Sequence, residues 1–258
     1  MTPSLGVQVG KLARRSIART LREPVIFIPS FVFPLFLLAV FAGASDRVTS
    51  IEGFPTDSYI TFILGGMVVQ AAAGATTMAG IEFGRDIESG FLDRLRLTPV
   101  RGFALVSAQL AGVALFGIAQ TVLVVLVGVA AGATLETGVG GAFVLVAFVL
   151  LLILAFGALG LVVAIRTGGA EAVQGMFSLI LALFFLSSMA MPRDLITEDW
   201  FKTIATVNPL SYPIEAARSL FISGWDAEAL ALGAGIAIAI LVVGLTLSVA
   251  LLRQRGDR

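Results

Sequence analysis

The chain contains neither cysteine nor histidine among its 258 residues. The lack of cysteine excludes disulfides and thiol chemistry, and the lack of histidine removes a common metal ligand and the usual proton carrier at neutral pH. Lysine and arginine, 17 together, balance 17 aspartates and glutamates. A formal charge of zero argues against a nucleic-acid partner, which requires a basic surface.

Charged residues of either sign are also scarce. They make up 13% of the chain, whereas soluble domains typically contain about 25%. Hydrophobic residues make up 58%, and the mean hydropathy is +1.00. This composition predicts a protein that crosses the lipid bilayer several times.

Six uncharged runs approach the roughly 20 residues that a helix needs to cross the hydrocarbon core. Their sequences lack the polar alternation of a barrel strand, and lipid offers the backbone no water, so we predict helices. The prediction is an all-α fold, with one transmembrane domain over residues 1–258 and six transmembrane helices. These lie at about 24–43, 58–80, 103–133, 140–165, 172–190 and 229–252.

The basic residues predict the orientation. With a cytoplasmic N-terminus, nearly all of them fall on the cytoplasmic side, and the exceptions are Arg47, Arg193, Lys202 and Arg218. Cytoplasmic loops carry an excess of lysine and arginine. We therefore predict a multi-pass protein of the cytoplasmic membrane with both termini in the cytoplasm.

Residues 5–22 have the pattern of an amphipathic helix. One side carries apolar residues, and the other carries Lys11, Arg14, Arg15, Arg19 and Arg22. Such a helix lies in the interface plane with its cations toward the lipid headgroups. It is either a topology signal alone or a lever at the cytoplasmic surface that packs beside the segment around Glu88.

The connection at 81–101 is the most informative segment. Phe83, Ile87, Phe91 and Leu95 recur every four residues, which predicts an amphipathic helix that Gly90 can interrupt. Pro99 ends it before the third span. A solvated, charged loop is the alternative interpretation of these residues.

Two motifs resemble a known family. The pattern Glu88-x-Gly90-x-Leu92-x-x-Leu95-x-x-Thr98-Pro99 is similar to the signature of ABC transporter type-2 permeases, especially the daunorubicin/doxorubicin-resistance branch. The segment Asn208-Pro209-Leu210-Ser211-Tyr212-Pro213-x-Glu215-x-x-Arg218 resembles the family's segment before the last span. The resemblance extends over nearly the whole chain.

This resemblance implies the partners and the working site. It implies a second permease subunit, identical or paralogous, and a separate ATP-binding cassette subunit that binds ATP and Mg²⁺ at the cytoplasmic face, while this chain binds no cofactor. The loop after the second span would be the coupling helix that contacts the cassette. The residues assigned to it are Glu88, Gly90, Phe91, Leu92, Asp93, Leu95, Arg96, Thr98 and Pro99.

Residues 191–228 form the largest predicted external segment. Pro192 is expected to end the fifth helix, and Glu215 and Arg218 are spaced to pair on a short helix. We interpret the segment as re-entrant or interfacial helices that form an outer lid, or else as an aromatic belt without a gating role. The residues assigned to the lid are Asn208, Pro209, Tyr212, Glu215 and Arg218.

The sequence favours a transport subunit over an enzyme. It has no Walker A loop, since the nearest imitation, Gly6 to Leu12, has the wrong spacing. No predicted span carries an ionisable residue near its middle, which disfavours coupling to an ion gradient. The glutamines at 70, 109, 120 and 174 are interpreted as bonding neighbouring helices rather than carrying substrate.

An apolar pathway suits a lipophilic or amphiphilic substrate, such as a drug-like compound or a lipid. Export of a lipid-linked glycan or polysaccharide is the alternative within the same superfamily. A gradient-driven carrier and a membrane-embedded enzyme are less favoured. A neighbouring gene for a cassette ATPase would support export, and its absence from the operon would reopen those two alternatives.

Overall fold

The computed structural model describes residues 5–22, 24–44, 48–96 and 102–256, and the regular structure within these ranges is entirely helical. The all-α prediction is therefore confirmed for the described residues. The elements are α1 (Leu5–Arg22), α2 (Pro24–Ala44), α3 (Tyr59–Glu88), α4 (Phe91–Arg96), α5 (Gly102–Ala130), α6 (Gly138–Thr167), α7 (Glu171–Phe185), η1 (Arg193–Leu195), α8 (Asp199–Val207), α9 (Ser211–Ile222) and α10 (Ala227–Gly256).

Four of these helices, α3, α5, α6 and α10, are long and apolar enough to cross a membrane. Each has 29 or 30 residues, which gives a length of about 45 Å against a hydrocarbon core of about 30 Å. Two further apolar stretches, Phe31–Gly43 in α2 and Glu171–Phe185 in α7, are shorter. The structure thus supports a multi-pass membrane protein, and the number of six spans stays a prediction.

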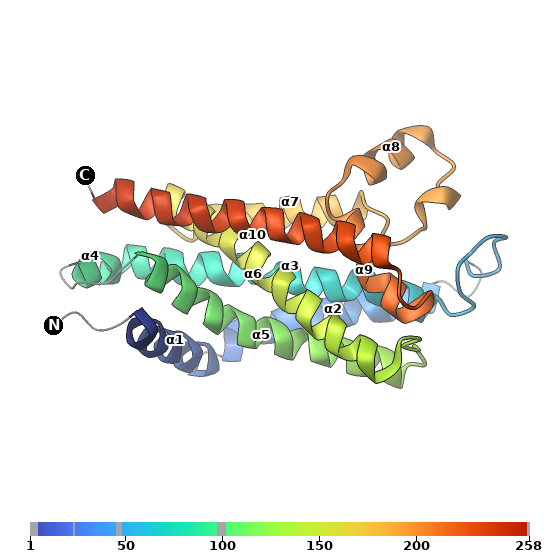
Figure 1. The fold of residues 1–258 in the computed structure, drawn as a ribbon, viewed down its shortest axis with the longest axis horizontal. Coiled ribbons are helices and arrows are strands. Elements are labelled where there is room, and N and C mark those ends of the chain that lie inside the picture. The colour runs from blue at the N-terminus through green and yellow to red at the C-terminus, as the bar shows by residue number, and fades with distance from the viewer. Residues whose placement is uncertain (1–4, 23, 45–47, 97–101, 257–258) are drawn as a thin grey trace.

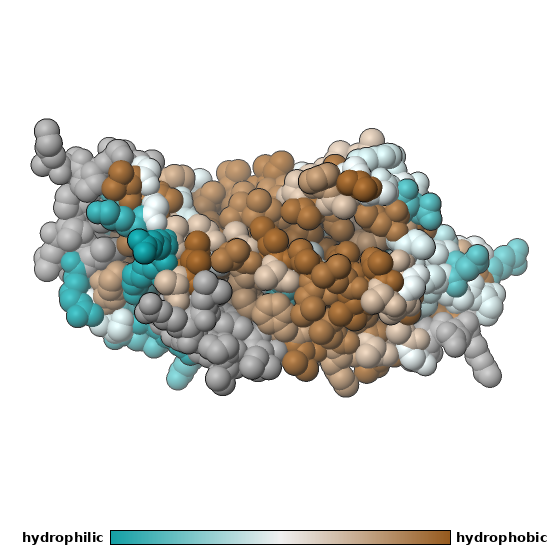
Figure 2. Space-filling model, turned by 90° about the horizontal axis from the view of Figure 1, so that it is seen from below, coloured by the Kyte–Doolittle hydropathy of each residue, from teal (hydrophilic) through white to brown (hydrophobic). Residues whose placement is uncertain are grey.

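The long helices run along the longest axis of the molecule (Figure 1). The short helix α4 and the C-terminal end of α10 lie at one end, with α1 beside them, and α8 and α9 lie at the other (Figure 1). We name these the α4 end and the α9 end. Hydrophobic residues cover the middle of the face shown in Figure 2, and hydrophilic residues gather toward the two ends. This banding fits a molecule whose middle lies in lipid.

Helix α3 is the centre of the bundle. It contacts α2, α5, α6, α7 and α9, and Phe62, Leu64 and Met67 have no exposed surface. Glycine permits its closest approach to two neighbours. A Cβ atom on Gly80 would lie 2.8 Å from Cγ2 of Val173 in α7 and 2.9 Å from the carbonyl oxygen of Gly160 in α6.

The predicted amphipathic helix within 81–101 is divided between two elements. Helix α3 continues to Glu88, because its later apolar residues, such as the buried Phe83, extend the same packed core. The helix then breaks at Gly90, whose φ of +65° is a conformation that favours glycine. The predicted interruption at Gly90 is confirmed, and α4 follows as a short separate helix.

The predicted end of the fifth helix at Pro192 is wrong, because α7 ends at Phe185. Carbonyl groups at this end of α7 accept hydrogen bonds from a side chain of a later segment. Asn208 Nδ2 donates to the carbonyl oxygens of Leu183 (2.7 Å) and Leu186 (3.0 Å). These long-range hydrogen bonds stabilise the end of the helix. The sequence around Phe185 does not predict them.

The tight packing of α3 predicts that Gly80→Ala destabilises the fold by about 1–3 kcal/mol, because overpacking forces neighbouring atoms apart. Gly235→Ala is the matched control, since a Cβ atom at Gly235 in α10 meets nothing within 4 Å. The measurement is the unfolding midpoint of the detergent-solubilised protein, followed by circular dichroism. Equal stability of the two variants would contradict the packing described here.

Candidate functional site

A single arginine connects three elements at the α4 end. Arg15 of α1 donates from Nη1 to Oδ2 of Asp86 in α3 (3.0 Å) and from Nη2 to Oδ1 (2.9 Å). Its Cζ atom also lies 3.6 Å from the ring centroid of Phe91 in α4. Bidentate pairing and a cation–π contact are among the stronger polar interactions of a guanidinium. The hypothesis that residues 5–22 pack beside the segment around Glu88 is therefore confirmed.

Glu88 forms a hydrogen bond with another segment of the same chain. Its Oε1 atom accepts a hydrogen bond from the backbone nitrogen of Ala170 (2.9 Å), which is the N-cap residue of α7. A carboxylate is favoured there because the first amide groups of a helix are unpaired and carry partial positive charge. Glu88 therefore links the last turn of α3 to the first turn of α7.

The remaining residues assigned to coupling are described only in part. Leu92 is buried in the core and Phe91 is half-buried. Arg94, which is not among the assigned residues, is exposed, and its Nη2 atom donates to the carbonyl oxygen of Ser89 (3.2 Å). The side chains of Asp93, Leu95 and Arg96, and the whole of Thr98 and Pro99, lie outside the described residues. Contact of this segment with a partner stays a prediction.

An apolar cavity of about 310 Å³ lies between α2, α3, α5 and α7. Its lining residues are Phe33, Pro34, Gln70, Gly74, Thr77, Met78, Gln120 and Phe177. The Oε1 atom of Gln70 and the hydroxyl of Thr77 are buried and have no hydrogen-bond partner in the described part of the chain. Such groups are costly to bury unpaired, and both belong to residues that line the cavity.

For Gln70 and Gln120, which line this cavity, the interpretation that they bond neighbouring helices stays a prediction. A Cβ atom at Gly74 would lie in ordinary van der Waals contact with Oε1 of Gln120, at 3.5 Å. In contrast, Gln109 fits the interpretation, since its Nε2 atom donates to Glu82 of the neighbouring helix at 2.7 Å.

Arg218 is the organising residue of the α9 end. Its Nε atom donates to the carbonyl oxygen of Phe62 (3.1 Å), and Nη2 donates to the carbonyl oxygens of Ser188 (2.8 Å) and Met189 (2.9 Å). The guanidinium also lies 3.7 Å from the ring centroid of Phe62. Burial lowers the pKa of Arg218 to about 9, so the side chain stays charged at neutral pH.

The predicted pair between Glu215 and Arg218 is wrong. Glu215 instead accepts a hydrogen bond from Nη2 of Arg193, which also stacks over the ring of Tyr212 at 4.9 Å. Burial opposes the charge of Arg193, but the hydrogen bond and the charge of Glu215 outweigh it, and the pKa of Arg193 is raised. The two residues are spaced correctly on α9, but packing against α3 turns Arg218 away.

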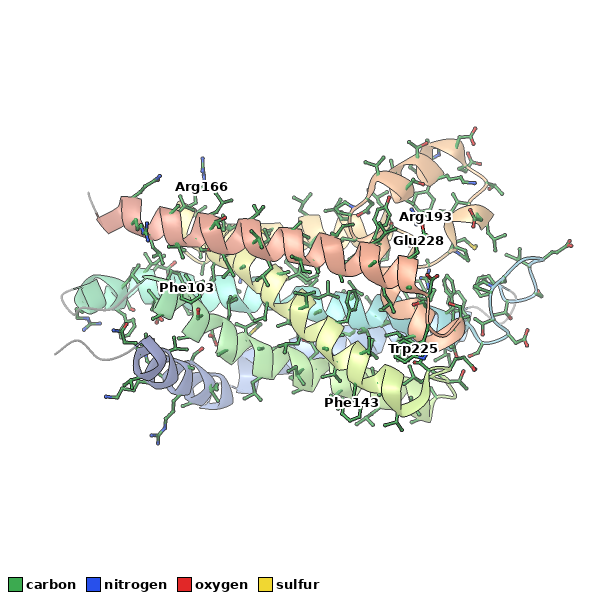
Figure 3. All side chains as sticks on the ribbon, in the orientation of Figure 1. Phe103, Phe143, Arg166, Arg193, Trp225 and Glu228 are labelled. Carbon is green, nitrogen blue, oxygen red and sulfur yellow. The ribbon has the colours of Figure 1, made fainter. Side chains whose placement is uncertain are left out.

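The other residues assigned to the lid connect α7, α8 and α9. Asn208 caps the end of α7, and the Tyr212 hydroxyl donates to the carbonyl oxygen of Thr206 in α8 (2.9 Å). Pro209 is exposed in the turn between α8 and α9. A cavity of about 570 Å³ beside them includes Arg193, Glu215 and Arg218 in its lining; Figure 3 shows Arg193 at this end of the molecule. Whether the segment gates a pathway stays a prediction.

Comparison with known proteins gives a consistent result. The model of the family described as ABC-2 type transporter matches residues 7–222. The chain is 27% identical over 221 residues to a putative transport permease, ycf38, of Cyanophora paradoxa, covering 83% of this chain and 74% of the relative. It is 29% identical over 203 residues to the daunorubicin resistance ABC transporter permease protein DrrB1 of Streptomyces coeruleorubidus, covering 76% and 69%.

The contacts of Arg218 predict that Arg218→Gln is strongly destabilising. The shorter amide cannot reach all three carbonyl groups, and a buried acceptor left unpaired costs about 1–3 kcal/mol. We expect a loss of about 3 kcal/mol in the free energy of unfolding, measured by denaturant titration in detergent. Lys202→Gln is the control, because Lys202 is an exposed cation of the neighbouring helix α8. A comparable loss of unfolding free energy in both variants would show that stability depends on positive charge at this end of the molecule rather than on the contacts of Arg218.

Proposed function

The chain belongs to the ABC-2 type transporter family, and from this premise we propose that it is the membrane permease subunit of an ATP-driven exporter of lipophilic or amphiphilic molecules. In this proposal the chain spans the cytoplasmic membrane six times, with the α4 end in the cytoplasm. Two permease subunits and separate ATP-binding cassette subunits form the transporter. ATP and Mg²⁺ bind to the cassettes, so the permease performs no hydrolysis itself.

The contact of Arg15 with Asp86 and Phe91 is the observation that supports this function best. A cassette that pushes on α4 or α1 acts on a cluster already joined to α3. The pair is bidentate, and the Asp86 side chain is buried although the Arg15 side chain is 40% exposed, so the cluster is held more firmly than a pair with both partners in solvent. Force applied at the α4 end is thereby delivered to the central helix.

Helix α3 is continuous between this cluster and the apolar cavity. Asp86 and Gln70 belong to the same helix, about 24 Å apart along its axis at 1.5 Å per residue. Glu88 adds a second connection, because it binds the start of α7, and α7 carries Phe177 to the same cavity. Displacement of the α4 end is therefore passed to the α3 and α7 walls of the cavity, and alternating access requires these walls to move relative to those formed by α2 and α5.

The cavity determines the substrate class in this proposal. Its aromatic and apolar lining suits a molecule that already partitions into lipid, and Gln70 and Thr77 offer acceptors for hydroxyl or amine groups. A drug-like amphiphile with hydrogen-bond donors fits both properties. A lipid-linked glycan is the second candidate, because its polyprenyl or acyl portion is also apolar, but its polar head would far exceed a cavity of about 310 Å³.

The coupling role is tested with Arg15→Gln in liposomes that contain the permease and its cassette. We expect the amount of substrate moved per ATP hydrolysed to fall about fivefold or more, as for a coupling free energy of 1 kcal/mol or above. Arg14→Gln is the matched control, because Arg14 is an exposed arginine on the same helix. An equal fall in substrate moved per ATP in both variants would contradict the coupling role of Arg15. If the unmodified complex moves no lipophilic probe in an ATP-dependent way, the proposed function itself is wrong.

The substrate role of the cavity is tested with Gln70→Leu. Loss of one hydrogen-bond acceptor is expected to raise the half-saturating concentration of a donor-bearing amphiphile about tenfold, measured as stimulation of cassette ATPase activity. A purely hydrocarbon-rich probe should be affected little. Gln174→Leu is the control, since Gln174 is exposed on α7 and does not line the cavity. Equal effects on both probes would contradict recognition through Gln70.

A further inference from the structure

A basic groove lies at the α4 end, between the C-terminal ends of α6 and α10. Its volume is about 450 Å³, and its lining residues are Ile165, Arg166, Leu251, Gln254 and Arg255. No residue of this lining belongs to the coupling cluster or to the apolar cavity. Figure 3 shows Arg166 at the end of the molecule where α10 also ends.

The polar lining of the groove is suited to an anion. Two guanidinium groups and one amide belong to its lining, and none of the lining residues that the structure describes is acidic. Arg255 is held in place by a hydrogen bond from Nη1 to the carbonyl oxygen of Ile165 (3.3 Å), while Arg166 is exposed at the last turn of α6. Guanidinium groups bind phosphate through paired N–H donors, and each has five such donors.

An apolar ridge leads along α10 into the same groove. Val243, Leu247 and Leu251 recur every four residues and therefore lie near one another on the helix surface, with Arg255 one step further. The side chains of Val243 and Leu247 are 52% and 46% exposed. On a membrane-crossing helix, this ridge faces the hydrocarbon region that acyl chains occupy.

We propose that this groove is a binding site for an anionic phospholipid. The headgroup phosphate binds Arg166 and Arg255, and an acyl chain lies along Val243, Leu247 and Leu251. Free phosphate offers the same headgroup chemistry, but only a lipid also covers the ridge. The bound lipid adds a contact between the ends of α6 and α10, where Arg255 already donates to the carbonyl oxygen of Ile165.

Binding is tested on the full chain in detergent with a short-chain phosphatidylglycerol, a phosphatidylcholine of the same chain length, and inorganic phosphate. Affinity is measured by native mass spectrometry and by the shift of the thermal unfolding midpoint. A basic residue near an anionic lipid surface contributes about a fivefold change in affinity. We therefore expect Arg166→Gln to weaken phosphatidylglycerol binding about fivefold, and Arg166→Gln with Arg255→Gln to weaken it about 25-fold.

Arg253→Gln is the matched control, because Arg253 is an exposed arginine of the same helix end and does not line the groove. It should change affinity less than twofold, and Arg166→Lys should keep most of the binding. The single Arg166→Gln variant decides the question even if the double variant fails to fold. Equal loss in Arg253→Gln, equal binding of phosphatidylcholine, or equally tight binding of inorganic phosphate would each overturn the lipid site.

Discussion

The structure depends on the burial of one helix, α3, by neighbours on all sides. In lipid there is little hydrophobic drive for helices to associate, so close van der Waals packing must supply the contact. Gly80 and Gly160 provide it where α3 meets α6 and α7. Because its neighbours hold it in place, α3 is a continuous, closely packed helix that connects the α4 end with the middle of the molecule.

Polar groups at the two ends of α3 are bound in different ways. At the α9 end, Arg218 donates to backbone carbonyl groups of α3 and of the segment after α7. At the α4 end, Asp86 and Glu88 bind α1 and the start of α7. The first arrangement is deeply buried and serves stability, whereas the second lies nearer the surface. It is there that our proposal places the input of force from a partner.

The pattern of charges and apolar runs was sufficient to predict the helical class, the helix at residues 5–22 and the break at Gly90. It also predicted the starts of α3, α5 and α6 to within two residues. These features follow from local periodicity and from the conformational preference of glycine. The end of α7 and the partner of Glu215 were predicted wrongly, because both are decided by side chains that approach from distant parts of the chain.

The sequence by itself determined that this is a helical membrane protein, since that conclusion rests on composition and on the length of the apolar runs. Only the tertiary structure brought Gln70 and Gln120 to one cavity, Arg15 to Asp86 and Phe91, and Arg166 to Arg255. The physical reason is that helix periodicity fixes which residues share a face. The neighbour that each face meets depends on how whole helices pack.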